Sequence, residues 1–202
     1  MTGVQTCALP ISAALCKESV RARVRFVVIG DGHLRHRLED QARTLGLTED
    51  VVFTGTRKDP ECFYPALDIV ALTSRNEGTP LTLIEAMLNA RPVIATAVGG
   101  VVDLLGDSVD TSEVENAQYS VCPRGMRVPT NDANAFAAGL IRLIEDKVMR
   151  RTTGERAREF AERQFAKERL LDDIWGLYQQ LVRTEPVATK ARSPERSLES
   201  RV

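Results

Sequence analysis

Short apolar runs that end at small residues alternate with helical segments along most of this chain, and this alternation limits the possible folds more than any other feature. The apolar, often β-branched runs occur four times, at residues 24–29, 51–54, 68–72 and 93–96. The segments between them have helical character, at residues 33–45, 59–66 and 80–89. Such alternation is typical of a parallel sheet covered on both faces. The sequence therefore predicts an α/β fold with a Rossmann-like, doubly wound parallel sheet.

From about residue 133 the pattern predicts helices only. Phe136, Leu140 and Ile144 recur at helical spacing in residues 133–145, which predicts an amphipathic helix. Two further helices are expected, over residues 150–165 and 167–183. The last of these carries apolar residues at helical spacing around Trp175, so we expect it to pack on the sheet or against a partner domain.

The two ends of the chain do not fit the alternating pattern. Residues 1–12 contain neither Lys nor Arg and are interrupted by Pro10, so they do not resemble a signal peptide. We interpret residues 1–12 as a non-native leader. Residues 184–202 are polar with two prolines, which predicts a disordered tail. The expected domain organisation is therefore a leader over 1–12, one domain over 13–183, and a tail over 184–202.

Charge and cysteine content exclude several classes of protein. Lys and Arg number 27 against 28 Asp and Glu, which gives a net charge of −1 and no basic surface for nucleic acid or for an anionic membrane. Nowhere do 18 consecutive apolar residues occur, so a transmembrane helix is not expected. The four cysteines form no C-x-x-C pair. A cytoplasmic protein with free thiols is expected.

Each predicted strand is followed by a loop of glycines or other small residues. Because the carboxyl ends of parallel strands meet at one edge of the sheet, where open α/β sheets bind ligands, we expect these loops to form one site. The loops are residues 30–32, 55–57, 76–80 and 98–100.

The loop before residues 80–89 has the clearest chemical character. Thr79 suits an N-cap and Pro80 suits the first helical position, so the N–H groups of the following turn are expected to bind phosphate. Glu77 and Glu85 repel phosphate, but carboxylates are strong acceptors for hydroxyl groups. The combination indicates a ligand with both phosphate and sugar diols, a nucleotide sugar. The alternative is that Glu77 satisfies a helix cap and Glu85 forms a surface ion pair.

The stretch from Ser74 to Met87, SRNEGTPLTLIEAM, continues through RPVIAT to VGG at residues 98–100. It closely resembles the E-x7-E signature of glycosyltransferase family 4, whose retaining enzymes have the GT-B fold of two Rossmann-like domains. The flanking segments VIGDG, VFTGTR and LDIV follow in the order of the family. The resemblance covers about residues 23–183 and implies the C-terminal, donor-binding domain.

The resemblance implies specific roles for the site residues. Glu77 would be the catalytic residue that holds the donor sugar near its anomeric centre, and Glu85 would bind the ribose diol. The remaining donor-binding positions would be Gly78, Thr79, Pro80 and Leu81 around the diphosphate, Gly55, Thr56 and Arg57 beside the nucleobase, and Gly30 and Gly32 in the same crevice. No metal and no other cofactor is implied; the nucleotide-diphosphate sugar is the substrate.

The chain also departs from the family. In the family, the first strand of this domain is followed by an Arg and a Lys that neutralise the leaving diphosphate. Neither that strand nor the acceptor-binding N-terminal domain is recognisable here. Arg57 or Arg75 could partly replace the clamp, although a surface role is expected for both. We therefore expect weak donor binding and little or no sugar transfer by this chain.

Three further residues carry expectations, and two functions other than sugar transfer are also compatible with the sequence. His33 and His36 are expected to face solvent rather than a metal. Asp103 is expected to cap the helix after residue 100, and the alternative is that it contacts the ligand. The chain could instead belong to another nucleotide-sugar enzyme of the same fold, such as an epimerase. It could also be a non-catalytic module that binds a nucleotide sugar.

Overall fold

The structure is a computed structural model that describes residues 18–114 and 117–183. The described chain divides into two compact units, one ending at Phe165 and the other beginning at Ala166. The first unit contains all of the described strands and helices α2 to α8, whereas the second contains helix α9, Lys167–Arg183. The candidate site lies in the first unit. The proposed leader and tail fall outside the described residues.

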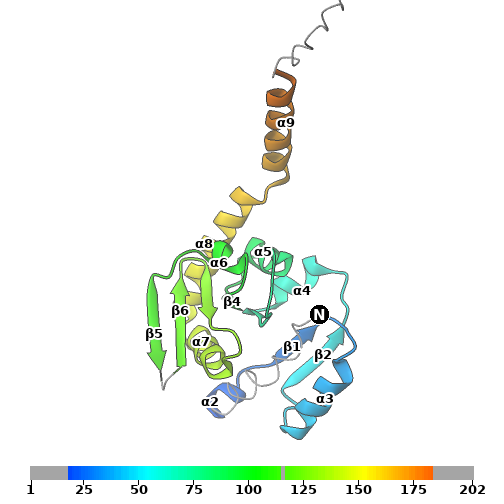
Figure 1. Cartoon of the computed structure of the whole chain (residues 1–202). Helices are drawn as coiled ribbons and strands as arrows, with labels where there is room; N and C mark the ends of the chain where they lie inside the picture. The colour runs from blue at the N-terminus through cyan, green and yellow to red at the C-terminus, as the bar shows by residue number, and fades with distance from the viewer. Residues whose placement is uncertain (1–17, 115–116, 184–202) are drawn as a thin grey trace, which may run out of the picture. The chain divides into compact units, whose positions relative to one another are not determined.

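Strands and helices alternate through the first half of the chain (Figure 1), which confirms the predicted α/β class. In chain order the first unit comprises α2 Glu18–Arg21, β1 Phe26–Ile29, α3 Arg35–Thr44, β2 Val51–Gly55, α4 Pro60–Ala66, β3 Val70–Leu72, α5 Leu81–Leu88, β4 Val93–Thr96, α6 Val101–Leu105, β5 Asp110–Val114, β6 Ala117–Cys122, β7 Gly125–Val128, α7 Ala133–Glu145 and α8 Lys147–Gln164.

The strands form two sheets. Strands β1 and β2 make a parallel pair, and a five-stranded sheet has the order β3-β4-β7-β6-β5. Strands β3, β4 and β7 run parallel, while β6 is antiparallel to both β7 and β5. The parallel part therefore contains every strand predicted from the sequence, and the antiparallel part extends it.

Strands β5, β6 and β7 have no counterpart in the sequence prediction. Strand β5, with the sequence DTSEV, contains a single apolar residue and lies at the edge of its sheet. In strand β6, AQYSVC, Gln118 and Ser120 interrupt the apolar residues, so it forms no continuous apolar run. Polar edge strands protect a sheet against pairing with other chains, and the same polarity hides them from a search for apolar runs.

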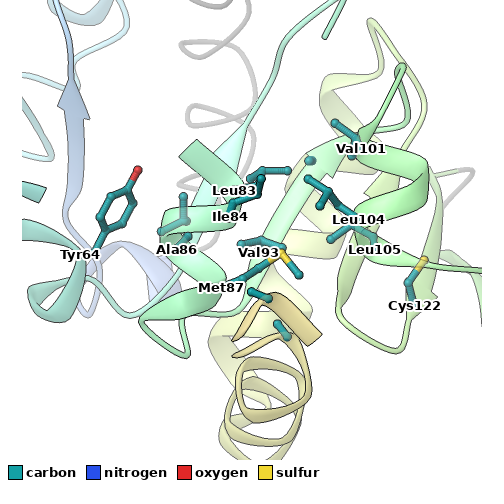
Figure 2. Packing of buried hydrophobic residues seen from close by; sticks show 14 residues of the cluster. Tyr64, Leu83, Ile84, Ala86, Met87, Val93, Val101, Leu104, Leu105 and Cys122 are labelled. Carbon is teal, nitrogen blue, oxygen red and sulfur yellow. The ribbon is translucent and has the colours of Figure 1, made fainter. Parts of the chain in front are cut away.

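Helices cover both faces of the five-stranded sheet. All four residues of β4 are buried, and its side chains alternate between two clusters. Ile94 packs with Met126, Val128 and helix α7, whereas Val93 and Ala95 pack on the opposite side. Figure 2 shows that second cluster, in which α5, α6 and α8 contribute Leu83, Met87, Val101, Leu104, Leu105, Ala157 and Ala161. This two-sided burial is the doubly wound arrangement.

A cavity of about 790 Å³ lies between the two sheets. Residues 23–27 and Ile29, at and before β1, line it on one side, and residues 68–71, at and before β3, line it on the other. Leu140 and Ile144 of α7 and Thr82 and Glu85 of α5 also line it. Because β1 and β3 are both end strands of their sheets, the cavity lies against two sheet edges.

Helix α9 leaves its apolar face exposed in the second unit. The exposed fraction is 65% for Trp175 and 43% for Ile174, and the neighbouring leucines are also exposed. The predicted bounds of this helix, residues 167–183, agree with the structure. The prediction that it packs on the sheet remains a prediction, because the two units are described separately.

Gly154 of α8 tests the packing of the first unit. A Cβ atom at this buried position would lie 2.2 Å from the carbonyl oxygen of Ala90, in the turn after α5. We expect Gly154→Ala to destabilise the protein by about 1–3 kcal/mol, because it overpacks a rigid backbone contact. Urea unfolding measures the change.

Gly176→Ala provides the control, since a Cβ at Gly176 of α9 meets no atom within 4 Å. Alanine is the better helix former, so this change should leave stability unchanged or raise it. Equal destabilisation by both substitutions would contradict the packing described for α8.

Candidate functional site

The loop after β3 and the loop after β4 are in close backbone contact just before the start of α5. The N–H of Gly100 donates a hydrogen bond to the carbonyl oxygen of Gly78 at 2.9 Å. A Cβ at Gly99 would lie 1.8 Å from the carbonyl oxygen of Glu77, and one at Gly100 would lie 2.3 Å from that of Gly78. Gly99 also has a φ of +46°, which favours glycine. Both glycines are therefore required for the loop after β4 to hold the loop after β3.

The ends of β3 and β4 are tied together just below these loops. Thr73, Ser74 and Thr96 are buried polar residues. The hydroxyl of Thr96 donates a short hydrogen bond to the carbonyl oxygen of Ser74. A satisfied buried hydroxyl fixes its surroundings, since leaving either group unpaired would be costly. The position of the Glu77 loop is thus set by side chains as well as by glycines.

The loops after β1 and β2 form a second pair. Gly30 donates a backbone hydrogen bond to Gly55 at 2.9 Å. Arg35 reaches across both loops, donating to Asp31 at 3.2 Å and to the carbonyl oxygen of Phe53 at 3.3 Å. These contacts hold Gly30 and Gly55 side by side. Gly32 and Thr56 are exposed beside them.

Residues next to both loop pairs line the inter-sheet cavity. Ile29, which precedes Gly30, and Thr82 and Glu85 of α5 all line that cavity. Within residues 18–114 and 117–183, no hydrogen bond joins the Gly30–Gly55 pair directly to the Glu77–Gly100 pair. The expectation that all four loops make one site therefore remains a prediction, with each loop pair as a building block.

Helix α5 begins one residue later than the sequence indicates. Pro80 occupies the N-cap with an extended ψ of 104°, and no side-chain hydrogen bond caps this end. The prediction that Thr79 is the N-cap is therefore wrong. The carbonyl oxygen of Pro80 accepts from Leu83 and Ile84, so the N–H groups of Leu81 and Thr82 precede the intrahelical hydrogen bonds. Such a helix start is suited to an anion.

The side chain of Glu85 is exposed on α5, although four of the eight residues of that helix are buried. Its Oε2 atom accepts a hydrogen bond at 2.9 Å from the hydroxyl of Tyr64, a buried residue of α4. Figure 2 shows Tyr64 at one edge of the core cluster, on the side of Ala86. The sequence analysis missed Tyr64, because an aromatic residue in a short helix gives no signal that it contacts a carboxylate 21 residues away.

The remaining candidate residues lie on the surface or in the core. Arg57 pairs with Asp59, two residues along, and this hydrogen bond lowers the pKa of Asp59 below its usual value. Asp103 lies inside α6 rather than at its N-cap, which is Gly100, so the prediction that it caps this helix is wrong. The error has a simple cause, since α6 begins at Val101, before Asp103.

Metal and thiol chemistry find little support in the described residues. No group of three or more His, Cys, Asp or Glu side chains suited to a metal ion occurs in residues 18–114 and 117–183. His36 is exposed, and its Nδ1 atom lies 3.7 Å from Oε2 of Glu39. Cys62 is an exposed free thiol and Cys122 a buried one. Within the same residues, no helix is long and apolar enough to cross a membrane.

This α/β fold is shared with glycosyltransferases of the GT-B class. Sucrose-phosphate synthase from Thermosynechococcus elongatus aligns with a TM-score of 0.72 and 26% identity over 90% of this chain and 43% of that chain. The C-terminal domain of a glycosyl transferase group 1 family protein, LpcC from Francisella tularensis, aligns with a TM-score of 0.63 and 25% identity over 80% of each chain. The fold therefore places the chain among the GT-B glycosyltransferases.

The chain belongs to the family described as glycosyl transferases group 1, whose profile matches residues 11–160. It is 35% identical over 146 residues to D-inositol 3-phosphate glycosyltransferase of Kineococcus radiotolerans, covering 68% of this chain and 32% of that protein. UDP-Gal:alpha-D-GlcNAc-diphosphoundecaprenol alpha-1,3-galactosyltransferase of Escherichia coli is 29% identical over 125 residues, covering 61% and 29%. The chain spans less than half of the length of the curated relatives it matches.

The interlocked loops allow a direct test by substitution. Gly100→Ala places a Cβ against the carbonyl oxygen of Gly78, so either the Glu77 loop or the start of α6 must move. We expect a loss of about 1–3 kcal/mol in the free energy of unfolding and faster hydrogen exchange at the amides of residues 77–79. Gly78→Ala is the control, because a Cβ there meets no atom within 4 Å. Unchanged exchange in Gly100→Ala would contradict the interlock.

Proposed function

We propose that this chain is the donor-binding domain of a retaining glycosyltransferase that takes its sugar from a nucleotide-diphosphate sugar. The observation that carries the proposal is the interlocked pair of loops at Gly78 and Gly100, which presents Glu77 and the start of α5 at one place. A relative whose name specifies UDP-Gal as donor supports this ligand class. The identities of the transferred sugar and of the nucleobase depend on the shapes of the loops around the site.

Each part of the donor has a matching group in this site. The N–H groups of Gly78, Thr79 and Leu81, at and before the start of α5, suit the diphosphate because a helix N-terminus favours negative charge. Glu85 lies about one turn further along α5 and would accept hydrogen bonds from the ribose diol. Glu77, partly buried in the loop, would hold the donor sugar. Gly55, Thr56 and Arg57 would border the nucleobase, and Gly30 and Gly32 would line the same crevice.

The cavity between the sheets supports a further part of the proposal, that one more strand belongs between β1 and β3. Strands in a sheet lie about 4.8 Å apart, so a strand in this cavity would pair with both edges and join the two sheets. Apolar residues of α7 on one side and Tyr64 and Phe63 of α4 on the other would cover its two faces. The alignment with the LpcC C-terminal domain supports the same domain assignment. An acceptor-binding domain would complete the enzyme.

Two other functions differ from this one in measurable ways. An epimerase-like enzyme of the same fold would convert a nucleotide sugar without any acceptor. A non-catalytic module would bind the donor and give no transfer even when an acceptor domain is supplied in trans. The sequence relatives, whose names specify glycosyl transfer, favour the first proposal.

Binding of nucleotides by the purified chain tests the role of Glu85. Hydrogen bonds to a charged acceptor contribute about 1.5–3 kcal/mol each, so Glu85→Ala should weaken the affinity for the preferred nucleoside diphosphate about 10- to 100-fold. Isothermal titration with UDP, GDP and ADP measures this change. Glu145→Ala, at an exposed position in the last turn of α7, is the control. Wild-type affinity in Glu85→Ala would contradict the proposed ribose contact.

Sugar transfer by the 202-residue chain tests whether donor binding alone is sufficient for catalysis. We expect the chain to bind donor but to release UDP from UDP-glucose, UDP-galactose or UDP-N-acetylglucosamine no faster than the spontaneous background. The physical reason is that positive charge on the leaving diphosphate usually supplies a large part of the catalysis, and Arg57 is already paired with Asp59. Ordinary enzymatic turnover by this chain would overturn the expectation.

A further inference from the structure

Tyr64 makes a contact that its place in the core does not require. Its ring is buried with an exposed fraction of 3% and lies at a tilted angle beside Phe63, with 4.5 Å between ring centroids. Its hydroxyl is 2.9 Å from Oε2 of Glu85 and 3.2 Å from the carbonyl oxygen of Thr82. The Thr82 carbonyl alone would satisfy a buried hydroxyl, yet the nearer acceptor is the carboxylate.

The two partners differ in how firmly they are held. Tyr64 belongs to the core cluster that includes Leu83 and Ile84, so its hydroxyl has a fixed position on α4. Glu85 is exposed and its long side chain has many rotamers available in water. A hydrogen bond from a fixed donor to a charged acceptor is stronger than one between neutral groups. The buried residue therefore restricts the exposed one.

The restricted carboxylate keeps most of its capacity to bind a ligand. An ionised carboxylate has two oxygens with about four acceptor sites, and Tyr64 occupies one of them on Oε2. Oε1 and the remaining site on Oε2 are left for two neighbouring hydroxyl groups. Burial, followed by the nearby Glu85 carboxylate, raises the pKa of Tyr64, so the hydroxyl keeps its proton and remains a donor at neutral pH.

We propose that Tyr64 is a positioning residue that orients the Glu85 carboxylate to accept both hydroxyls of a ribose. This inference rests on the proposed function, because it deepens the role given there to Glu85. Tyr64 itself touches no ligand group; it acts through Glu85 by removing the alternative orientations of that side chain before the nucleotide binds.

The test compares UDP with 2′,3′-dideoxy-UDP on the full 202-residue chain. We expect Tyr64→Phe to weaken UDP binding about 5- to 10-fold, while the affinity for the dideoxy nucleotide changes less than about 2-fold, because that ligand lacks the diol. In the Glu85→Ala background, adding Tyr64→Phe should weaken UDP binding no further. Isothermal titration gives all of these affinities.

Tyr119→Phe is the matched control, since Tyr119 is also a buried tyrosine but belongs to the cluster around α7. It removes a tyrosine hydroxyl from the core without touching Glu85 and should leave both affinities unchanged. Thermal unfolding of each variant shows whether it is folded. A general loss of structure in Tyr64→Phe would lower both affinities together, so the difference between the two ligands isolates the positioning effect.

The outcomes separate the two proposals. If Tyr64→Phe weakens both ligands equally, or adds its full effect to that of Glu85→Ala, Tyr64 does not position Glu85, although Glu85 could still bind the ribose. If Glu85→Ala leaves UDP affinity unchanged, or the wild-type chain binds no nucleoside diphosphate, the proposed function fails first and the role of Tyr64 fails with it.

Discussion

The close approach of two backbone segments, at Gly78 and Gly100, is the constraint on which the candidate site depends. Any side chain at residue 99 or 100 would overlap a carbonyl oxygen of the facing loop, and the hydrogen bond between Gly100 and Gly78 closes the gap that the glycines leave. This contact fixes the chain leading into α5. It therefore decides where Glu77 and the first N–H groups of that helix lie relative to each other.

The core explains why these loops can be held so firmly. Strand β4 is buried on both faces, and α5 is packed through Leu83, Ile84, Ala86 and Met87. With its inner face fully used for packing, α5 presents Glu85 on its exposed side. Tyr64 then connects that exposed position to the core. The rigid layer and the polar site are thus parts of one arrangement, in which packing decides where the acidic groups point.

The sequence predicted strands β1 to β4 and the helices of the first unit that have a clear apolar stripe, because these depend on apolar periodicity. Strand β4 and helices α7 and α9 have the bounds that the pattern indicates, since each has a clear apolar run or stripe. Strands β5 and β6 could not be found in this way, because β5 is almost entirely polar and polar residues interrupt the apolar residues of β6. The predicted start of α5 was one residue too early. Thr79 and Pro80 both suit the start of a helix, and only the backbone angles show that Pro80 is the N-cap.

Site residues were predictable where they belong to one continuous stretch of sequence, and unpredictable where they meet through packing. Gly78 and Gly100 belong to one recognisable stretch of sequence, whereas the contact between Tyr64 and Glu85 depends on how α4 lies against α5.

The most direct test of the whole account is a crystal structure of the chain with UDP. The account predicts ribose hydroxyls about 3 Å from the Glu85 carboxylate and the diphosphate at the start of α5. UDP bound elsewhere, with Glu85 directed into solvent, would contradict it.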